Sequence, residues 1–190
     1  MSYRYQILRD DSLEEFVKFW AEAYNYSAGD SLYTKNIGQP LTEEGIRELF
    51  FWKNGGKLSK LKAKSVNDNF VSSISKLRTF PKDTPPDQWL NVFKAGGAIW
   101  RIFFLHIWNP KYPIFDQHLF RAMKFIQTGE GLEIPSGDPK KVEFYLEKYL
   151  PFYFELEKEM KNPNPRNLDR ALWKFGQILK RIKPPVKLNS

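Results

Sequence analysis

One carboxylate in the sequence, Asp116, stands where it could take part in a reaction. It lies in the stretch Tyr-Pro-Ile-Phe-Asp-Gln-His-Leu-Phe-Arg, residues 112–121, behind a proline-containing turn and an apolar pair. A carboxylate can stabilise a developing positive charge and can activate or position a water molecule. A carboxylate at a helix start can instead simply accept backbone N–H groups, favoured by the helix dipole. The sequence leaves both roles open for Asp116.

Three polar residues follow Asp116 up to residue 121, namely Gln117, His118 and Arg121. We interpret His118 as a structural histidine that satisfies a backbone carbonyl, because one histidine without a carboxylate cluster is a poor metal site. Arg121 can reach a phosphate or pair with a neighbour on its helix, and both interpretations stay open. His106 lies in a run of Ile, Phe, Leu and Trp, which predicts a buried core histidine. We therefore expect no metal and no cofactor.

Two adjacent glycines, Gly96 and Gly97, stand before the apolar run 98–108. Glycines at a helix start let the backbone approach a ligand closely, and the free N–H groups there can bind phosphate. A tight turn between two helices needs glycine equally, so this alternative is also open. Lys94 precedes the pair and would add a positive charge to a phosphate site.

The joint spacing of these features resembles the core of the helix–hairpin–helix DNA glycosylase superfamily, which includes the 8-oxoguanine glycosylase-like proteins. In that family a hairpin ends in glycine, a helix crosses the core, and a segment of the form Pro/Val-Asp-x-His-apolar-x-Arg follows. The resemblance covers about residues 90–125 and places Asp116 on the family's catalytic carboxylate. It implies a catalytic role for Asp116, with Gln117 and His118 as supporting residues.

The hairpin departs from the family pattern, which usually reads apolar-Pro-Gly-apolar-Gly. Residues 92–97 read Val-Phe-Lys-Ala-Gly-Gly, so Gly96 takes the place of the second glycine and Lys94 that of the first. Bifunctional members carry a lysine nucleophile two residues after the second glycine, where this chain has Ala98. The resemblance thus implies a monofunctional hydrolase, in which water cleaves the N-glycosidic bond of a modified or damaged base.

The composition indicates a globular protein. The 190 residues are 42% hydrophobic and 16% aromatic, which is enough for a sizeable core. The absence of cysteine excludes a disulfide framework and a family-type iron–sulfur cluster. No apolar run reaches the length of a membrane span, and the first residues lack the apolar core of a signal peptide. We expect a cytoplasmic protein, nucleoid-associated if bacterial, with no membrane partner.

The net charge of +8 is concentrated in the middle of the chain. Residues 53–101 hold 10 basic and 3 acidic side chains. Such a basic face is typical of a protein that binds a polyanion such as nucleic acid, and a lysine-rich solvated surface is the alternative. The resemblance implies that the partner is DNA. Its densest part begins with Lys53, Lys57 and Lys60, which either follow a nucleic-acid backbone or belong to a solvated, mobile loop.

Helical signals dominate the sequence and predict an all-α protein, and the resemblance implies a helix–hairpin–helix glycosylase-like fold. Ser12 and Glu15 form a capping box at the start of the helix predicted over 12–24. Pro151 should kink or break the helix predicted over 138–160. We expect loops over 27–40 and 53–65. The apolar spacing predicts helices over 12–24, 41–52, 66–80, 85–93, 96–108, 116–127, 138–160 and 164–182.

The length fits one compact helical unit over 1–190, with a tail at 183–190. Two small lobes, 1–80 and 81–182, that share one core are also compatible with the length.

Two other functions are compatible with the sequence. The chain can be a catalytically inactive member of the same fold that binds nucleic acid or a protein, in a defence or toxin-type system. It can also be an unrelated all-α interaction module, whose C-terminal helices (138–182) would contact a protein partner.

Overall fold

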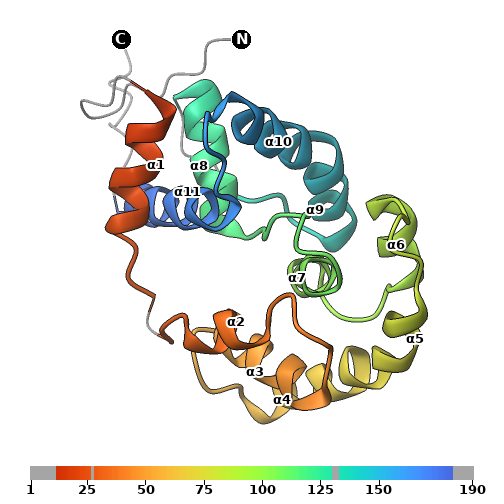
Figure 1. The fold of residues 1–190 in the computed structure, drawn as a ribbon. Helices are drawn as coiled ribbons and strands as arrows, with labels where there is room; N and C mark the ends of the chain where they lie inside the picture. Colours follow the sequence, from red (N-terminus) through yellow and green to blue (C-terminus); the bar gives the residue numbers. More distant parts are fainter. Residues whose placement is uncertain (1–11, 27, 130–132, 182–190) are drawn as a thin grey trace. The chain divides into compact units, whose positions relative to one another are not determined.

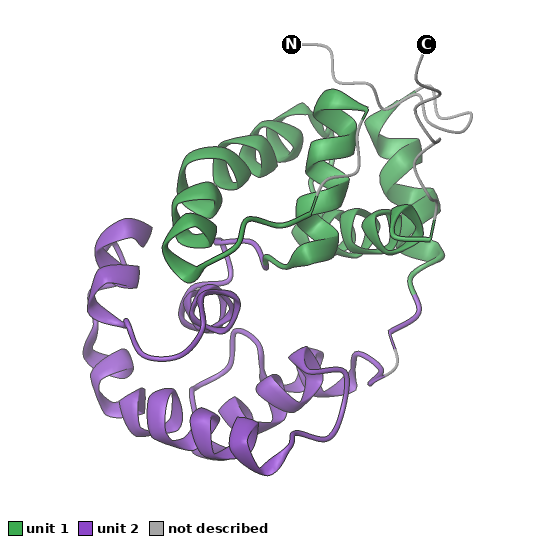
Figure 2. Ribbon diagram, turned by 180° about the vertical axis from the view of Figure 1, so that it is seen from behind, with its two compact units in different colours: residues 1–24, 115–190 green, residues 25–114 purple. Residues whose placement is uncertain are grey.

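A computed structural model of the chain describes residues 12–26, 28–129 and 133–181. Within these residues all regular structure is helical, which confirms the predicted all-α class. The chain divides into two compact units, each described here by itself: unit 1 comprises residues 1–24 and 115–190, and unit 2 comprises residues 25–114 (Figure 2). Unit 1 is thus built from two separated stretches of sequence, whereas the predicted lobes were continuous.

Unit 1 is organised around its last helix. Both α1 and α8 pack against α11, so the first and last helices of the described residues lie side by side (Figure 1). The apolar face of α11 buries Leu168, Leu172 and Phe175. The helices of unit 1 are α1 (Leu13–Glu22), α8 (Gln117–Thr128), α9 (Asp138–Phe144), the π-helical turn η2 (Tyr145–Tyr149), α10 (Leu150–Glu159) and α11 (Pro165–Leu179).

Side-chain caps fix where the helices of unit 1 begin. Ser12 accepts the N–H of Glu15 at the start of α1, as the predicted capping box requires. Asn164 accepts the N–H of Asn167 at the start of α11, at 3.1 Å. Such caps satisfy backbone donors that have no partner within the helix.

The helix predicted over 138–160 changes its hydrogen-bond register before Pro151. The N–H of Leu150 donates to the carbonyl of Tyr145, five residues back, which is the π pattern. Because proline has no N–H to donate, one wider turn before it lets the chain continue as α10 without a break. The turn places Tyr145 and Tyr149 in the core of unit 1, both fully buried.

Unit 2 is built on aromatic packing around α7. The ring of Phe50 stacks on Phe70 at 4.5 Å and meets Phe103 edge-on at 5.5 Å. The helices of unit 2 are α2 (Ser31–Asn36), α3 (Glu43–Lys53), α4 (Lys60–Asn69), the 3-10 turn η1 (Val71–Ser73), α5 (Ile74–Thr79), α6 (Pro86–Val92) and α7 (Ala98–Trp108).

His106 is a buried core histidine of unit 2, as predicted, with 2% of its surface exposed. Its Nδ1 lies 2.7 Å from the carbonyl oxygen of Tyr112, which can only accept, so Nδ1 carries the proton. The hydroxyl of Tyr33 then donates to Nε2 at 2.8 Å. Both ring nitrogens are satisfied inside the protein.

Two segments of unit 2 differ from the sequence prediction. The expected loop 27–40 contains α2, and the expected lysine-rich connector 53–65 becomes helical at Lys60, where Ser59 caps α4. The helix predicted over 66–80 is interrupted, because α4 ends at Asn69 and η1 leads into α5. In the described part of the chain, no helix is both long and apolar enough to cross a membrane.

Candidate functional site

Asp116 is the N-cap residue of α8. Its Oδ1 accepts the N–H of His118 at 2.8 Å and the N–H of Leu119 at 3.3 Å. The residue is half-buried, and its backbone is extended before the helix begins. These bonds fix the orientation of the carboxylate, and the helix dipole favours its negative charge. The capping role is thus present, and a fixed anion is also what a catalytic carboxylate requires.

His118 has the structural contact that its sequence context predicts. Its ring hydrogen-bonds to the backbone carbonyl of Gly176 on α11, and the ring of Trp173 lies 5.0 Å away, edge-on. Nδ1 faces the Arg121 guanidinium at 3.4 Å and must accept there, so Nε2 carries the proton. Burial lowers the pKa of His118, which keeps the imidazole neutral at pH 7.

Arg121 lies inside unit 1, with 5% of its surface exposed. Its guanidinium contacts Gln117 Oε1 and His118 Nδ1, each at 3.4 Å, and lies 3.7 Å from a carboxylate oxygen of Glu133. The sequence left Arg121 either to reach a phosphate or to pair with a neighbour on its helix, and the structure shows contacts with neighbours on its helix. We therefore leave Arg121 out of the proposed nucleic-acid surface. Gln117 is exposed beside Asp116.

The glycine pair forms the turn between α6 and α7. Gly96 has a φ of 85°, in the left-handed region, and a Cβ there would lie 2.6 Å from Cζ of Phe70. Gly97 is the N-cap residue of α7 and offers no side-chain acceptor to the first N–H groups. Arg101 of α7 stabilises the turn, because its guanidinium donates to the backbone carbonyls of Phe93 and Leu90 at 2.9 and 2.6 Å.

Replacing Gly96 with alanine should destabilise this turn. The new Cβ is disfavoured at positive φ and strikes Phe70, which cannot move away because it is stacked on Phe50. We expect a loss of at least about 1–2 kcal/mol, measured by urea unfolding. Gly97→Ala is the matched control, because Gly97 is exposed and its φ of −70° suits alanine. Equal stability of the two variants would contradict this geometry of the turn.

The predicted lysines of unit 2 do not all have the same environment. Lys57, Lys60 and Lys94 are exposed, and none has an ion pair among the described residues. Lys53 is half-buried, with Nζ 5.8 Å from the ring centroid of Phe103. Unit 2 as a whole holds 13 basic and 7 acidic side chains, so it carries most of the net positive charge.

A hollow of about 250 Å³ lies beside the α6–α7 turn of unit 2. Its floor is aromatic, with Phe70, Phe93 and Phe104, and its rim holds Lys76 and Lys94. Nζ of Lys76 lies 5.1 Å over the ring of Phe93. Exposed ammonium groups around an apolar floor suit an anionic ligand with an apolar face.

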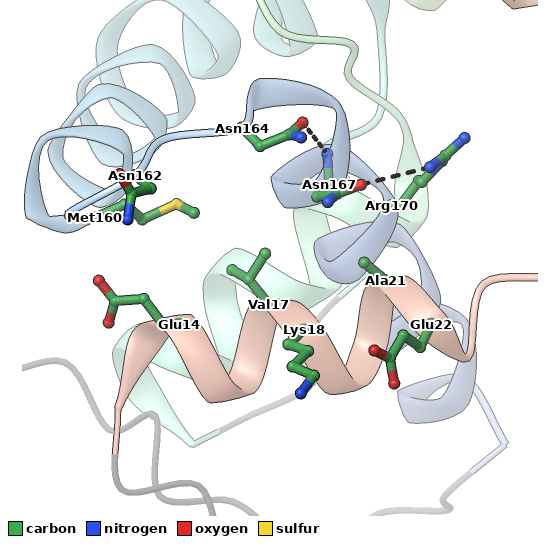
Figure 3. A pocket seen from close by; sticks show the side chains of 10 residues that line it. All are labelled: Glu14, Val17, Lys18, Ala21, Glu22, Met160, Asn162, Asn164, Asn167 and Arg170. Carbon is green, nitrogen blue, oxygen red and sulfur yellow. Dashed lines mark hydrogen bonds between the residues drawn. The ribbon is translucent and has the colours of Figure 1, made fainter.

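A second hollow, of about 440 Å³, lies in unit 1 between α1 and the start of α11 (Figure 3). Val17 and Ala21 of α1 line its apolar side. Asn164 and Arg170 line the other side, and Arg170 donates to the side chain of Asn167 at 3.4 Å. Glu14 at its edge accepts the N–H of Lys161, which lowers the pKa of that carboxyl. None of the predicted site residues lines it.

The predicted site residues fall into two sets. Asp116, Gln117, His118 and Arg121 come together at the start of α8 in unit 1. The predicted glycines and lysines all belong to unit 2. The described residues contain no group of three or more His, Cys, Asp or Glu side chains suited to a metal ion.

Sequence reasoning missed Gly176, whose backbone carbonyl meets the ring of His118, and the buried Tyr149 and Asp169 of unit 1. The sequence signal for Asp169 was a carboxylate on the apolar side of α11, where it is buried with 5% of its surface exposed.

Comparison of the chain with protein-family models, curated proteins and solved structures finds no match.

Proposed function

We propose that this protein is a monofunctional DNA glycosylase, which hydrolyses the N-glycosidic bond of a modified or damaged base with Asp116 as its catalytic carboxylate. The observation that carries the proposal is the fixed Asp116 carboxylate, held by two backbone N–H groups at the start of α8. The sequence resemblance supports it by placing Asp116 on the catalytic position of the helix–hairpin–helix glycosylases.

The reaction needs a negative charge close to the sugar. As the glycosidic bond breaks, the sugar develops oxocarbenium character, which a fixed carboxylate stabilises. The same carboxylate positions the water whose oxygen bonds to the sugar, and the base leaves with the electron pair of the broken bond. Ala98 is buried with 1% of its surface exposed, so the lysine position of bifunctional members offers no amine for a Schiff base.

The hairpin and the exposed lysines support a role for unit 2 in binding the DNA backbone. The α6–α7 turn exposes Gly97 at a helix start, where backbone N–H groups favour phosphate. Lys57, Lys60 and Lys94 add three exposed charges without acidic partners among the described residues. A surface of this type binds without regard to sequence and depends strongly on salt.

Removal of these lysine charges should weaken DNA binding and its salt dependence. For Lys57→Gln, Lys60→Gln and Lys94→Gln, we expect the slope of log K against log[salt] to decrease by about 0.9 for each lysine that contacts a phosphate. Fluorescence anisotropy with a labelled duplex measures the slope. Lys158→Gln on α10 is the control, since it removes an equally exposed charge. The same decrease in the control would contradict a specific role for the three lysines.

Base excision tests the proposed activity directly. The protein is incubated with duplexes that each carry one modified base, and alkali then cleaves any abasic sites. We expect excision of at least one base and no covalent product after borohydride, because no lysine occupies the nucleophile position. A borohydride-trapped adduct would refute the monofunctional mechanism. No excision across the panel would argue for the second candidate.

The second candidate is a catalytically inactive member of the same class that binds nucleic acid or a protein. The capping bonds of Asp116 favour it, because they account for an aspartate at this position without catalysis. The hollow between α1 and α11 would be its contact site for a protein partner.

A further inference from the structure

The hollow of about 250 Å³ in unit 2 has an aromatic floor that belongs to the core. The ring centroid of Phe104 lies 5.1 Å from that of Phe70 and 5.7 Å from that of Phe93. None of these three residues has more than 7% of its surface exposed. Because protein interiors are close-packed, such a floor keeps its shape whether or not a ligand is present.

Two lysines, Lys76 and Lys94, give the rim of this hollow its positive charge. Both are exposed, and neither has an ion pair among the described residues. Nζ of Lys76 lies 5.1 Å from the ring centroid of Phe93, so one ammonium group lies directly over the floor. No aspartate or glutamate is among the described residues that line the hollow. The rim therefore favours an anion.

The other walls of the hollow offer an apolar edge and a hydrogen-bond acceptor. Val92, at this edge, has 42% of its surface exposed. Asn69 donates through Nδ2 to the hydroxyl of Ser65 at 2.9 Å, and its Oδ1 has no hydrogen-bond partner among the described residues. The lining therefore suits a ligand with a negative charge, a flat apolar face and an N–H donor.

We infer that this hollow binds one nucleotide, with the base against the aromatic floor and the phosphate at Lys76 and Lys94. A nucleotide combines a phosphate, a ring with apolar faces and N–H groups that Asn69 can accept. The volume of about 250 Å³ lies below the roughly 300–1,000 Å³ of sites for drug-sized ligands, so it suits the base, with the phosphate at the rim. All lining residues belong to unit 2, and the inference does not depend on base excision.

Three probes test the two halves of the site: adenosine 5′-monophosphate (AMP), adenosine and inorganic phosphate. Each is titrated into the ¹⁵N-labelled full chain, and binding is followed by NMR. We expect saturable shifts of residues 92–95 with AMP, and binding at least about tenfold tighter than that of adenosine or phosphate alone. In Lys76→Gln and Lys94→Gln, AMP binding should weaken about tenfold because the phosphate loses a charged donor, while adenosine binding should not change.

Lys60→Gln is the matched control, because Lys60 is an equally exposed lysine of unit 2 that does not line the hollow. This variant should bind AMP as the wild type does. All three lysines are exposed, so the variants should stay folded, which circular dichroism checks. AMP binding no tighter than phosphate binding, or the same loss in Lys60→Gln, would overturn the inference.

A short single-stranded oligonucleotide distinguishes the two sources of such a ligand. If Lys76→Gln weakens oligonucleotide binding as it weakens AMP binding, the hollow takes an unpaired nucleotide of a strand. If it weakens AMP binding alone, the ligand is a free nucleotide. AMP binding without base excision would refute only the proposed glycosylase, whereas excision without AMP binding would refute only this inference.

Discussion

Asp116→Asn should lower the rate of base excision by at least about 100-fold and leave DNA affinity unchanged or higher. Electrostatic stabilisation and general acid–base effects of one group are each worth about 10²–10⁴ in rate. The substitution removes the charge that would stabilise the oxocarbenium-like sugar, and with it a negative charge that repels phosphate. Single-turnover excision and anisotropy binding measure the two effects separately.

Asparagine is the informative replacement because it keeps the helix cap. Its side-chain oxygen can accept the N–H groups of His118 and Leu119 as Oδ1 of Asp116 does, and asparagine caps helices about as well as aspartate. Asp116→Ala would remove both the charge and the cap and should lose about 1 kcal/mol of stability in addition.

A second cap in the same unit separates capping from catalysis. Asn164 caps α11 through the N–H of Asn167, so Asn164→Ala should also lose about 1 kcal/mol, with excision retained. If Asp116→Asn excises bases as fast as the wild type, Asp116 is only a cap, and the glycosylase proposal fails.

Local signals in the sequence predicted the helix starts around the candidate site well. Ser12, Asp116 and Asn164 each stand at a helix start and accept a backbone N–H group, as their side chains can do without help from distant residues. The ends of α7 and α8 agree with prediction to within a few residues, because proline and glycine mark them. The interpretation of His118 was equally local, since it depended on the absence of other ligands nearby.

Long-range packing explains what could not be predicted. The lysine-rich segment before Val66 forms a helix that Ser59 caps and that buries Val66, whereas its exposed lysines suit a loop equally well. The contact between His118 and Gly176 depends on how α8 and α11 meet, which no spacing within one helix reveals. The pairing of α1 with α11 joins residues about 150 positions apart, so no local pattern indicates it.

Gly176→Ala should destabilise unit 1 by about 3 kcal/mol or more, because Gly176 lies where α8 and α11 cross. A Cβ at Gly176 would lie 1.9 Å from the carbonyl oxygen of His118 and 2.6 Å from its carbonyl carbon. Both atoms are backbone, so one helix must shift, and the hydrogen bond from His118 to the Gly176 carbonyl would be strained. The clash exceeds the gain of about 1 kcal/mol that alanine offers inside a helix.

Gly45→Ala is the matched control for this substitution. Gly45 is also a buried helical glycine, but the atoms nearest its Cβ would be side-chain atoms of Asn36 and Thr42, at 2.9 and 3.0 Å, rather than backbone atoms. Urea unfolding followed by circular dichroism should therefore show a much larger loss for Gly176→Ala than for Gly45→Ala. The Asp116 cap lies beside this crossing, because the N–H of His118 donates to Asp116 and the carbonyl of His118 faces Gly176. A Gly176→Ala variant as stable as the wild type would mean that α8 and α11 do not cross this closely.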